Sequence, residues 1–233
     1  MTTNLLARSL DGITLLDQIP PADLNRLSER CKWQHYEQGM QILGHMDRSE
    51  GICFVVQGKA RVVIYSVSGK SVTFRDIAAG DMFGELSAID GQERSASVEA
   101  LEPCTIATLS PELFREVLQI YPAVSAALLQ RLTAQVRHLT ERVFEFSTLA
   151  VKNRIHAELL RLARKTPHDN GQAWISPAPT HAEIASRIST HREAVTRELN
   201  HLAHSGLIER KDGKLLILNV SQLSKLVQEV TGH

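Results

Sequence analysis

A series of six glycines spaced by 7 to 12 residues constrains the fold more than any other feature: Gly39, Gly51, Gly58, Gly69, Gly80 and Gly91. Between the glycines stand short runs rich in β-branched and aromatic residues, such as ICFVV, ARVVIY and SVTFRDI. Short strands separated by turn residues at this spacing are typical of antiparallel barrels and jelly rolls. We therefore expect a jelly roll over residues 20–110, with a hairpin turn at VSGK (67–70) and a helix in the preceding PPADLNRLSERC.

Beyond Pro111 the apolar pattern changes to the period of helices. ELFREVLQIYP predicts a short helix that ends at Pro122, because proline interrupts helical hydrogen bonding. One long helix is expected from there to about residue 150. Its apolar residues are spaced alternately by three and four positions, as in the a/d seam of a coiled coil: Leu129, Leu132, Val136, Leu139, Val143, Phe146 and Ala150.

Such a seam either packs on the helix's own domain or pairs with another helix. The seven consecutive matches favour pairing. Because the sequence holds one helix of this kind, the expected partner is a second copy of the chain in a parallel homodimer.

Charge is distributed unevenly although the chain is neutral overall. Residues 1–147 carry 14 Lys and Arg against 18 Asp and Glu, whereas residues 148–233 carry 12 against 8 and seven of the ten histidines. A basic C-terminal part suggests an anionic partner. The three cysteines lie far apart without metal-ligand spacing, which is typical of reduced thiols. With neither a signal-peptide pattern nor a membrane-length apolar run, we expect a cytoplasmic protein with no membrane partner and no metal.

The C-terminal part contains two helix-start signals ten residues apart. Thr180 with Glu183 forms a capping-box pattern, and Thr190 with Glu193 repeats it. The first helix is expected to run to about Ile188 and the second to end near Gly206, which together make a helix-turn-helix. Its internal contacts are expected to be Ala185, Ile188, Val195 and Leu199. IERKDGKLLIL then predicts a β-hairpin wing with Asp212-Gly213 in its turn.

The exposed start of the second helix predicts a DNA-reading surface. In a helix-turn-helix, residues at this position face base edges in the major groove. Arginine matches O6 and N7 of guanine, and glutamate can accept from N4 of cytosine. The candidate DNA-binding residues are His191, Arg192, Glu193, Thr196 and Arg197.

The stretch STHREAVTRELNHLAHSGLIERKDGKLLIL resembles the winged helix of the CRP/FNR family of bacterial transcription regulators. The resemblance extends over most of the chain and implies an α+β fold. It implies an N-terminal antiparallel β jelly roll that binds cyclic nucleotide (1–121), a dimerisation helix (122–148) and a winged helix-turn-helix that binds DNA (149–233).

Further expectations follow from the resemblance alone. Arg192, Glu193 and Arg197 match the base-reading positions of cAMP-receptor-type members, which implies a palindromic TGTGA-like site on double-stranded DNA rather than TTGA. RNA polymerase is implied as a further partner. Ser189 departs from the glycine found in many such turns, a departure that should have a small energetic cost.

FGELSAIDGQERSAS (83–97) falls where the family places its phosphate-binding segment. The chemistry supports a pocket independently, because backbone N–H groups of a short helix starting at Gly84 can face an anion. Arg94 can hold a cyclic phosphate bidentately, Ser95 adds a hydroxyl, and Glu85 suits the ribose 2′-OH. The candidate phosphate- and sugar-binding residues are Gly84, Glu85, Leu86, Arg94, Ser95 and Ala96. The spacing is one residue shorter than in the family's best-known members, which a loop at Asp90-Gly91 should absorb.

Recognition of the base is less constrained. Counting back from NRIHAELLRLA, the base-contacting positions on the long helix match Leu139 and Thr140, the second acting from the other subunit. A count forward from RLTAQ gives a register that differs by four residues. Leucine cannot replace a hydroxyl, whereas Ser95 is compatible with the 2-amino group of a syn guanine. The expected effector is therefore cAMP, cGMP or both.

Other functions find less support in the sequence. It contains no catalytic triad, P-loop or Rossmann motif, so an enzyme is not expected. A regulator of the same architecture that needs no effector, or that senses haem or a gas through His35 or His45, is the alternative. An iron–sulfur sensor would need an N-terminal cysteine cluster, which the sequence lacks.

Overall fold

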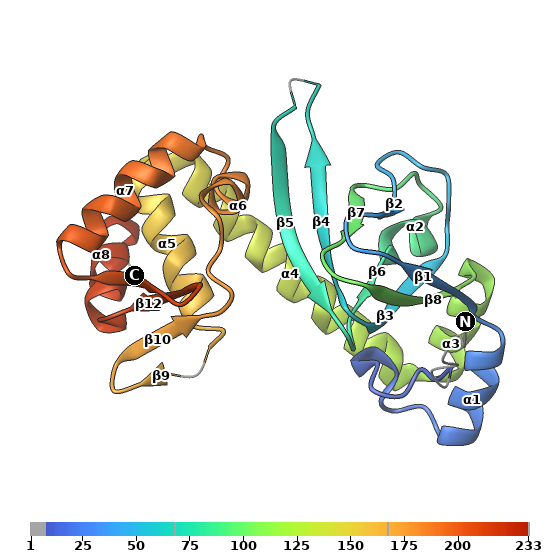
Figure 1. Cartoon of the computed structure of the whole chain (residues 1–233). Coiled ribbons are helices and arrows are strands. Elements are labelled where there is room, and N and C mark those ends of the chain that lie inside the picture. The colour runs from blue at the N-terminus through green and yellow to red at the C-terminus, as the bar shows by residue number, and fades with distance from the viewer. Residues whose placement is uncertain (1–7, 68, 167, 233) are drawn as a thin grey trace, which may run out of the picture. The chain divides into compact units, whose positions relative to one another are not determined.

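The computed structural model describes residues 8–67, 69–166 and 168–232, which fold as two compact units (Figure 1). The first unit comprises residues 1–64 and 73–136, and the second comprises residues 65–72 and 137–233. The long helix is shared, because the two units divide between Val136 and Arg137 rather than at either of its ends.

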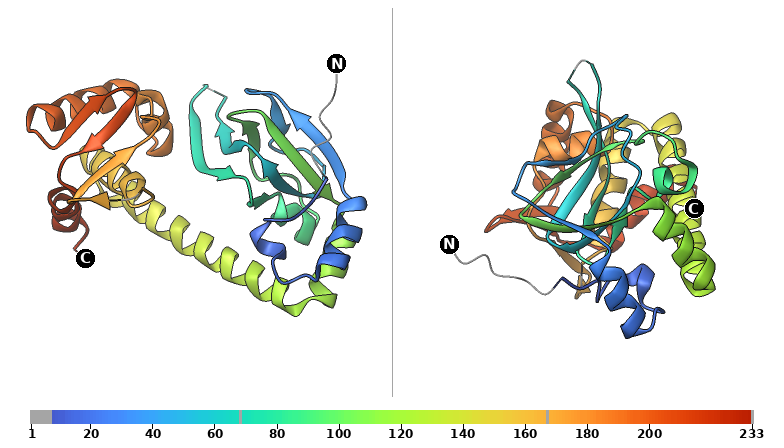
Figure 2. Two further views of the ribbon diagram at one scale, coloured as in Figure 1. Left: turned by 60° about the horizontal axis from the view of Figure 1, so that its bottom comes forward. Right: turned by 90° about the vertical axis from the view of Figure 1, so that its right-hand side faces the viewer.

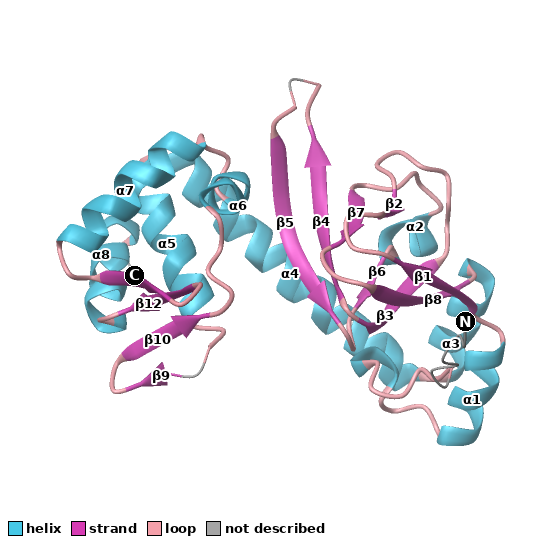
Figure 3. Ribbon diagram, in the orientation of Figure 1, coloured by secondary structure: helices cyan, strands magenta, loops and turns pink. Residues whose placement is uncertain are grey.

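The first unit is a jelly roll of two four-stranded antiparallel sheets (Figure 3), which confirms the fold class. One sheet has the order β1-β8-β3-β6 and the other β2-β7-β4-β5. The strands are β1 Lys32–Tyr36, β2 Gln41–Leu43, β3 Ile52–Gln57, β4 Lys59–Tyr65, β5 Ser71–Ala78, β6 Met82–Phe83, β7 Ser97–Ala100 and β8 Cys104–Leu109. The turn predicted at VSGK includes Ser68, which lies outside the described residues.

Helices close one end of the roll (Figure 2). They are α1 Pro21–Glu29, α3 Pro111–Ile120 and the start of α4 Pro122–Thr148, with a short 3-10 turn at Thr14–Leu16. Phe54, Phe114 and Val124 are fully buried together there, so strand, helix and long helix share one core. Ser110 caps α3 by accepting from the Leu113 N–H at 3.4 Å, and Pro111 occupies the first helical position.

Helix α4 spans 27 residues, and its bounds confirm the predicted long helix. Leu132 packs partly on the core of the roll, and Phe146 packs partly on the core of the second unit. The other seam residues of α4 are exposed: Leu129 by 65%, Val136 by 62%, Leu139 by 39% and Val143 by 64%. Ala150, predicted as the seventh seam position, is wrong, because α4 ends at Thr148 and Ala150 is the extended N-cap of the next helix.

The second unit is a winged helix-turn-helix. Helix α5 Val151–Ala163 leads to a sheet of order β11-β12-β10-β9, with helices α6 His181–Arg187, α7 Arg192–His204 and α8 Val220–Thr231 around it. Its strands are β9 His168–Asp169, β10 Gln172–Ile175, β11 Ile208–Lys211 and β12 Lys214–Ile217. The wing turn is confirmed: Asp212 and Gly213 both have positive φ, 50° and 71°, as a two-residue hairpin requires. The four predicted internal residues of the helix-turn-helix are all buried in one cluster.

The two predicted capping boxes have different outcomes. Thr180 accepts from the Glu183 N–H at 3.1 Å while Glu183 accepts from the Thr180 N–H at 2.8 Å, which confirms the first box. The second is wrong, because α7 has His191 as its N-cap, without a side-chain cap bond. Thr190 instead donates its N–H to the Ala185 carbonyl at 3.0 Å, which makes it part of the turn between the helices.

Candidate nucleotide pocket and DNA-reading helix

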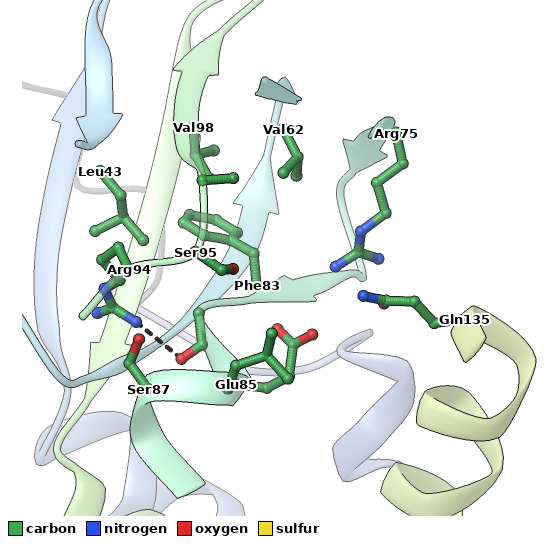
Figure 4. A pocket seen from close by; sticks show the side chains of 13 residues that line it. Leu43, Val62, Arg75, Phe83, Glu85, Ser87, Arg94, Ser95, Val98 and Gln135 are labelled. Carbon is green, nitrogen blue, oxygen red and sulfur yellow. Dashed lines mark hydrogen bonds between the residues drawn. The ribbon is translucent and has the colours of Figure 1, made fainter. Parts of the chain in front are cut away.

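A pocket opens in the first unit between the start of helix α2 (Glu85–Asp90), the segment before β7, and one turn of α4. The space inside it, counted together with the part that is open to solvent, is about 430 Å³. Six predicted phosphate- and sugar-binding residues line it together: Gly84, Glu85, Leu86, Arg94, Ser95 and Ala96. Figure 4 shows Arg94, Ser87 and Glu85 around its floor, with the apolar side chains of Leu43, Val62, Phe83 and Val98 above them.

Arg94 is fixed by hydrogen bonds to the protein and still has N–H donors that are not used by them. Only 3% of the residue is exposed. Its Nε donates to Ser49 Oγ at 3.0 Å, and its two terminal nitrogens donate to the carbonyls of Gly84 at 2.8 Å and Gly51 at 2.6 Å. A guanidinium carries five N–H donors, so these bonds leave one on each terminal nitrogen. That pair matches two oxygens of a phosphate.

Gly84 is needed for this arrangement on two grounds. Its φ of +78° lies in the left-handed region, which favours glycine. A Cβ built there would lie 2.5 Å from an Arg94 terminal nitrogen and 3.2 Å from the Gly51 carbonyl oxygen. Gly91 ends α2 with a φ of +70°, so the predicted loop at Asp90-Gly91 is where the chain turns back toward Arg94.

The charges lining the pocket sum to one positive charge. Arg75, Glu85 and Arg94 are its charged residues, and Glu85 is only 4% exposed. Burial lowers the pKa of Arg75, and the attraction of Glu85 acts in the opposite direction. A buried charge is stable when it is paired. The lining therefore suits a ligand with a single negative charge, such as a cyclic mononucleotide.

Leu139 and Thr140 do not line this pocket in the single chain that the structure describes. Thr140 lies along a groove of the second unit, between α4, α5 and α8. Gln135, four residues before Leu139 on α4, lines the pocket instead. The count forward from RLTAQ would place the contacts four residues after Leu139 and Thr140, at Val143 and Phe144, which do not line the pocket either. A contact from Thr140 of a second copy stays a prediction.

Arg75 and Gln135 are pocket residues that the sequence analysis missed. Arg75 is a cation in the β-rich run SVTFRDI, and Gln135 is the last residue of RLTAQ, which served only as an anchor for counting along the helix. Nothing in the sequence pointed to either residue as part of a pocket, because β5 and α4 come together at this site only in the folded chain.

The DNA-reading residues predicted on α7 have mixed exposure. His191, Arg192, Glu193 and Arg197 are exposed, whereas Thr196 is half-buried. The Thr196 hydroxyl donates to the Arg192 carbonyl at 3.0 Å and also lies 2.7 Å from Nδ1 of His181. Because the Thr196 hydrogen is used in the first bond, His181 must be the donor in the second.

His181 thereby links the helix-turn-helix to the wing. Its other nitrogen, Nε2, faces a terminal nitrogen of Arg210 at 3.5 Å, and Arg210 also donates to the Pro179 carbonyl at 3.1 Å. Burial, and then the charges of Arg210 and Arg192, lower the pKa of His181 below its ordinary value of 6.5. A neutral His181 that donates from Nδ1 and accepts at Nε2 satisfies both neighbours.

Other candidate sites find no such geometry. His35 and His45 are exposed and do not line the pocket. Across the described residues, no group of three or more His, Cys, Asp or Glu side chains is arranged to hold a metal ion. Over the same residues, none of the helices combines the length and apolar character needed to cross a bilayer.

Comparison with known proteins identifies both units. A model of the cyclic nucleotide-binding domain matches residues 33–121, and a model of the Crp-like helix-turn-helix domain matches residues 153–226. The cAMP-activated global transcriptional regulator CRP of Salmonella typhimurium is 28% identical over 81% of this chain and 90% of its own length. The cAMP-activated regulator Vfr of Pseudomonas aeruginosa is 28% identical over 84% of this chain and 92% of its own.

The fold comparison agrees. A solved structure of CooA from Carboxydothermus hydrogenoformans superposes with a TM-score of 0.76, at 20% identity over 85% of this chain and 88% of that one. A jelly roll with a nucleotide-domain pocket, followed by a winged helix-turn-helix, defines the chain as a DNA-binding transcription regulator. It belongs to the CRP/FNR family.

Proposed function

We propose that the protein is a cyclic-nucleotide-responsive regulator, a homodimer that binds cAMP or cGMP and then a palindromic, TGTGA-like DNA site. The observation that carries the proposal is the state of Arg94, which is buried and fixed by three hydrogen bonds yet keeps two donors for a phosphate. Family resemblance assigns RNA polymerase as a further partner.

In the proposed complex each pocket group has one task. The two remaining N–H donors of Arg94 hold the cyclic phosphate, with the Ser95 hydroxyl beside them. Glu85, acceptor-only when ionised, takes the ribose 2′-OH. The break between α4 and α5, at Leu149-Ala150, is the hinge through which the ligand alters the DNA-binding part. The ligand shifts that equilibrium only by its differential affinity for the two states.

Replacing Arg94 tests the ligand half of the proposal. Arg94→Leu removes two charge-assisted bonds, so nucleotide affinity in isothermal titration should fall by about a hundredfold, with nucleotide-dependent DNA binding lost. Arg94→Lys keeps the positive charge but loses the paired N–H donors of the guanidinium. Its nucleotide affinity should therefore lie between those of Arg94→Leu and wild type. Arg48→Leu is the matched control, because Arg48 is exposed and pairs with Glu93 outside the pocket. DNA binding that needs no nucleotide in wild type and variants alike would favour the effector-independent alternative.

Replacing Arg192 tests the DNA half. Arg192→Ala should cost about 1–3 kcal/mol on the preferred site and relax the requirement for one guanine in each half-site. Competition binding with wild-type and substituted half-sites measures both effects. Lys225→Ala, an exposed cation on α8, should leave the preference among half-sites unchanged. An Arg192→Ala protein with wild-type discrimination would refute the assigned reading position.

A further inference from the structure

The end of the pocket away from Arg94 carries two polar side chains that neither a phosphate nor a ribose explains. Arg75 extends from β5 and Gln135 from α4, and Figure 4 shows both reaching into the same end of the pocket. Arg75 donates one hydrogen bond, to the Met82 carbonyl at 3.1 Å. A guanidinium has five N–H donors, so most of its donors are available to a ligand.

The space between the two ends suits a flat aromatic ring. Leu43, Val62, Phe83 and Val98 supply an apolar wall there; Figure 4 shows Val98, Phe83 and Val62 between Arg94 and Arg75, and Leu43 above Arg94. A ligand whose phosphate lies at Arg94 would place its base along this wall. The outer edge of that base then meets Arg75 and Gln135.

Donor and acceptor chemistry decides which base fits. Arginine has no acceptor, so the edge facing Arg75 must present acceptors. The N7 edge of guanine presents two, N7 and O6, whereas the same edge of adenine presents N7 beside an N6 amino donor. Adenine would therefore turn an N–H toward the Arg75 guanidinium, which cannot accept it. Even if the Gln135 carbonyl oxygen accepted from N6, adenine would offer Arg75 one acceptor where guanine offers two, and a buried donor left unpaired is costly.

We propose that Arg75 and Gln135 read the O6 and N7 edge of guanine, so that the pocket prefers cGMP to cAMP. This inference rests on the proposed nucleotide-binding function. Gln135 supplies an amide N–H to O6 or N7 beside Arg75. A syn guanine would at the same time bring its 2-amino group toward Ser95 near the phosphate. A single orientation of guanine can therefore contact Ser95 at one end of the pocket and Arg75 and Gln135 at the other.

Titration calorimetry on the full chain with cGMP, cAMP and cyclic IMP tests the inference. Cyclic IMP keeps O6 and N7 but lacks the 2-amino group, so it separates the two ends of the base. We expect cGMP to bind at least about tenfold more tightly than cAMP, the value of one charged hydrogen bond. The affinity of cyclic IMP should be close to that of cGMP and higher than that of cAMP.

Variants assign the preference to residues. Arg75→Ala should weaken cGMP and cyclic IMP by at least about tenfold while changing cAMP by less than about threefold. Gln135→Ala should act in the same direction with a smaller effect. Arg61→Ala is the matched control on the neighbouring strand, because Arg61 pairs with Asp76 at 2.8 Å and does not line the pocket. Where Arg75→Ala does not fold, Arg75→Lys keeps the charge without the fork and should show the same selective loss.

The outcomes separate this inference from the function on which it rests. Tighter binding of cAMP than of cGMP would overturn the base assignment and leave cyclic-nucleotide binding intact. Equal weakening of both nucleotides by Arg75→Ala would show that Arg75 serves the phosphate or the fold, and would also overturn it. Failure of all three nucleotides to bind would refute the proposed function itself.

Discussion

At the scale of single residues, Gly84 and Ser189 both have a left-handed backbone conformation, but for different reasons. At Gly84 the backbone has a φ of +78° and Arg94 approaches so closely that a side chain has no room. At Ser189 the φ is +52°, and the strain of an L residue there is the cost that the sequence analysis anticipated. One position is constrained by a neighbour and the other by the turn alone.

Ser189→Gly should therefore stabilise the second unit. Relief of the left-handed strain, less the greater freedom of glycine in the unfolded chain, should raise the free energy of unfolding by about 0.5–1 kcal/mol. Urea unfolding of the full chain measures it. Ser189→Ala is the control, since alanine keeps the strain and should bring no gain. A destabilised glycine variant would show that Ser189 has a structural role of its own.

At the scale of elements, a buried ionic network joins the end of α4 to α5 and α6. Glu158 on α5 is almost fully buried and pairs with Arg161 on the same helix, Arg142 on α4 at 3.5 Å and Arg187 on α6 at 3.8 Å. Glu145 pairs with Arg142 at 3.0 Å and with Arg161 at 2.5 Å. Arg142 also lies over the Phe146 ring at 4.6 Å from its centroid. The network fixes the last turns of α4 on the DNA-binding unit.

Glu158→Gln should destabilise the second unit strongly. The change leaves three arginines around a buried position with one counter-charge fewer, and breaking a buried pair typically costs about 3–5 kcal/mol. Thermal or urea unfolding measures the loss. Glu141→Gln, an exposed carboxylate of α4, should change stability by less than about 0.5 kcal/mol. Equal stabilities of the two variants would contradict a structural role for the network.

At the scale of the whole molecule, an exposed apolar seam on α4 calls for a partner. Four of its large apolar residues are between 39% and 65% exposed in the single chain, and they repeat with heptad spacing. An apolar stripe of this kind in water favours association. The proposed homodimer would bury it against the same stripe of a second copy.

Val136→Glu together with Val143→Glu should convert the dimer to a monomer. Facing carboxylates along the seam would repel one another and leave apolar area exposed. Sedimentation velocity with and without nucleotide measures the mass. Ala134→Glu, placed on the outer side of α4 by the heptad, is the control and should stay dimeric. A wild-type chain that sediments as a monomer under both conditions would remove the dimer from the proposal.

Local patterns predicted much of this structure because they arise from neighbours in the chain. The Thr180 and Glu183 capping box, the Asp212-Gly213 turn and the bounds of α4 depend on residues a few positions apart, and all agree with the structure. The second capping box failed where a longer-range bond intervened, since the Thr190 N–H is used by the Ala185 carbonyl in the turn. Spacing alone could not reveal that competition.

The sequence by itself determined the jelly roll, the long helix, the winged helix and the segment from Gly84 to Ala96, because periodicity and turn chemistry act locally. Only the tertiary structure decided which side chains share the pocket. The carbonyls of Gly51 and Gly84 fix Arg94, and the fold brings Arg75 of β5 and Gln135 of α4 to the same pocket. These residues lie far apart in the chain, so no local rule relates them, and only the folded backbone sets the distances between them.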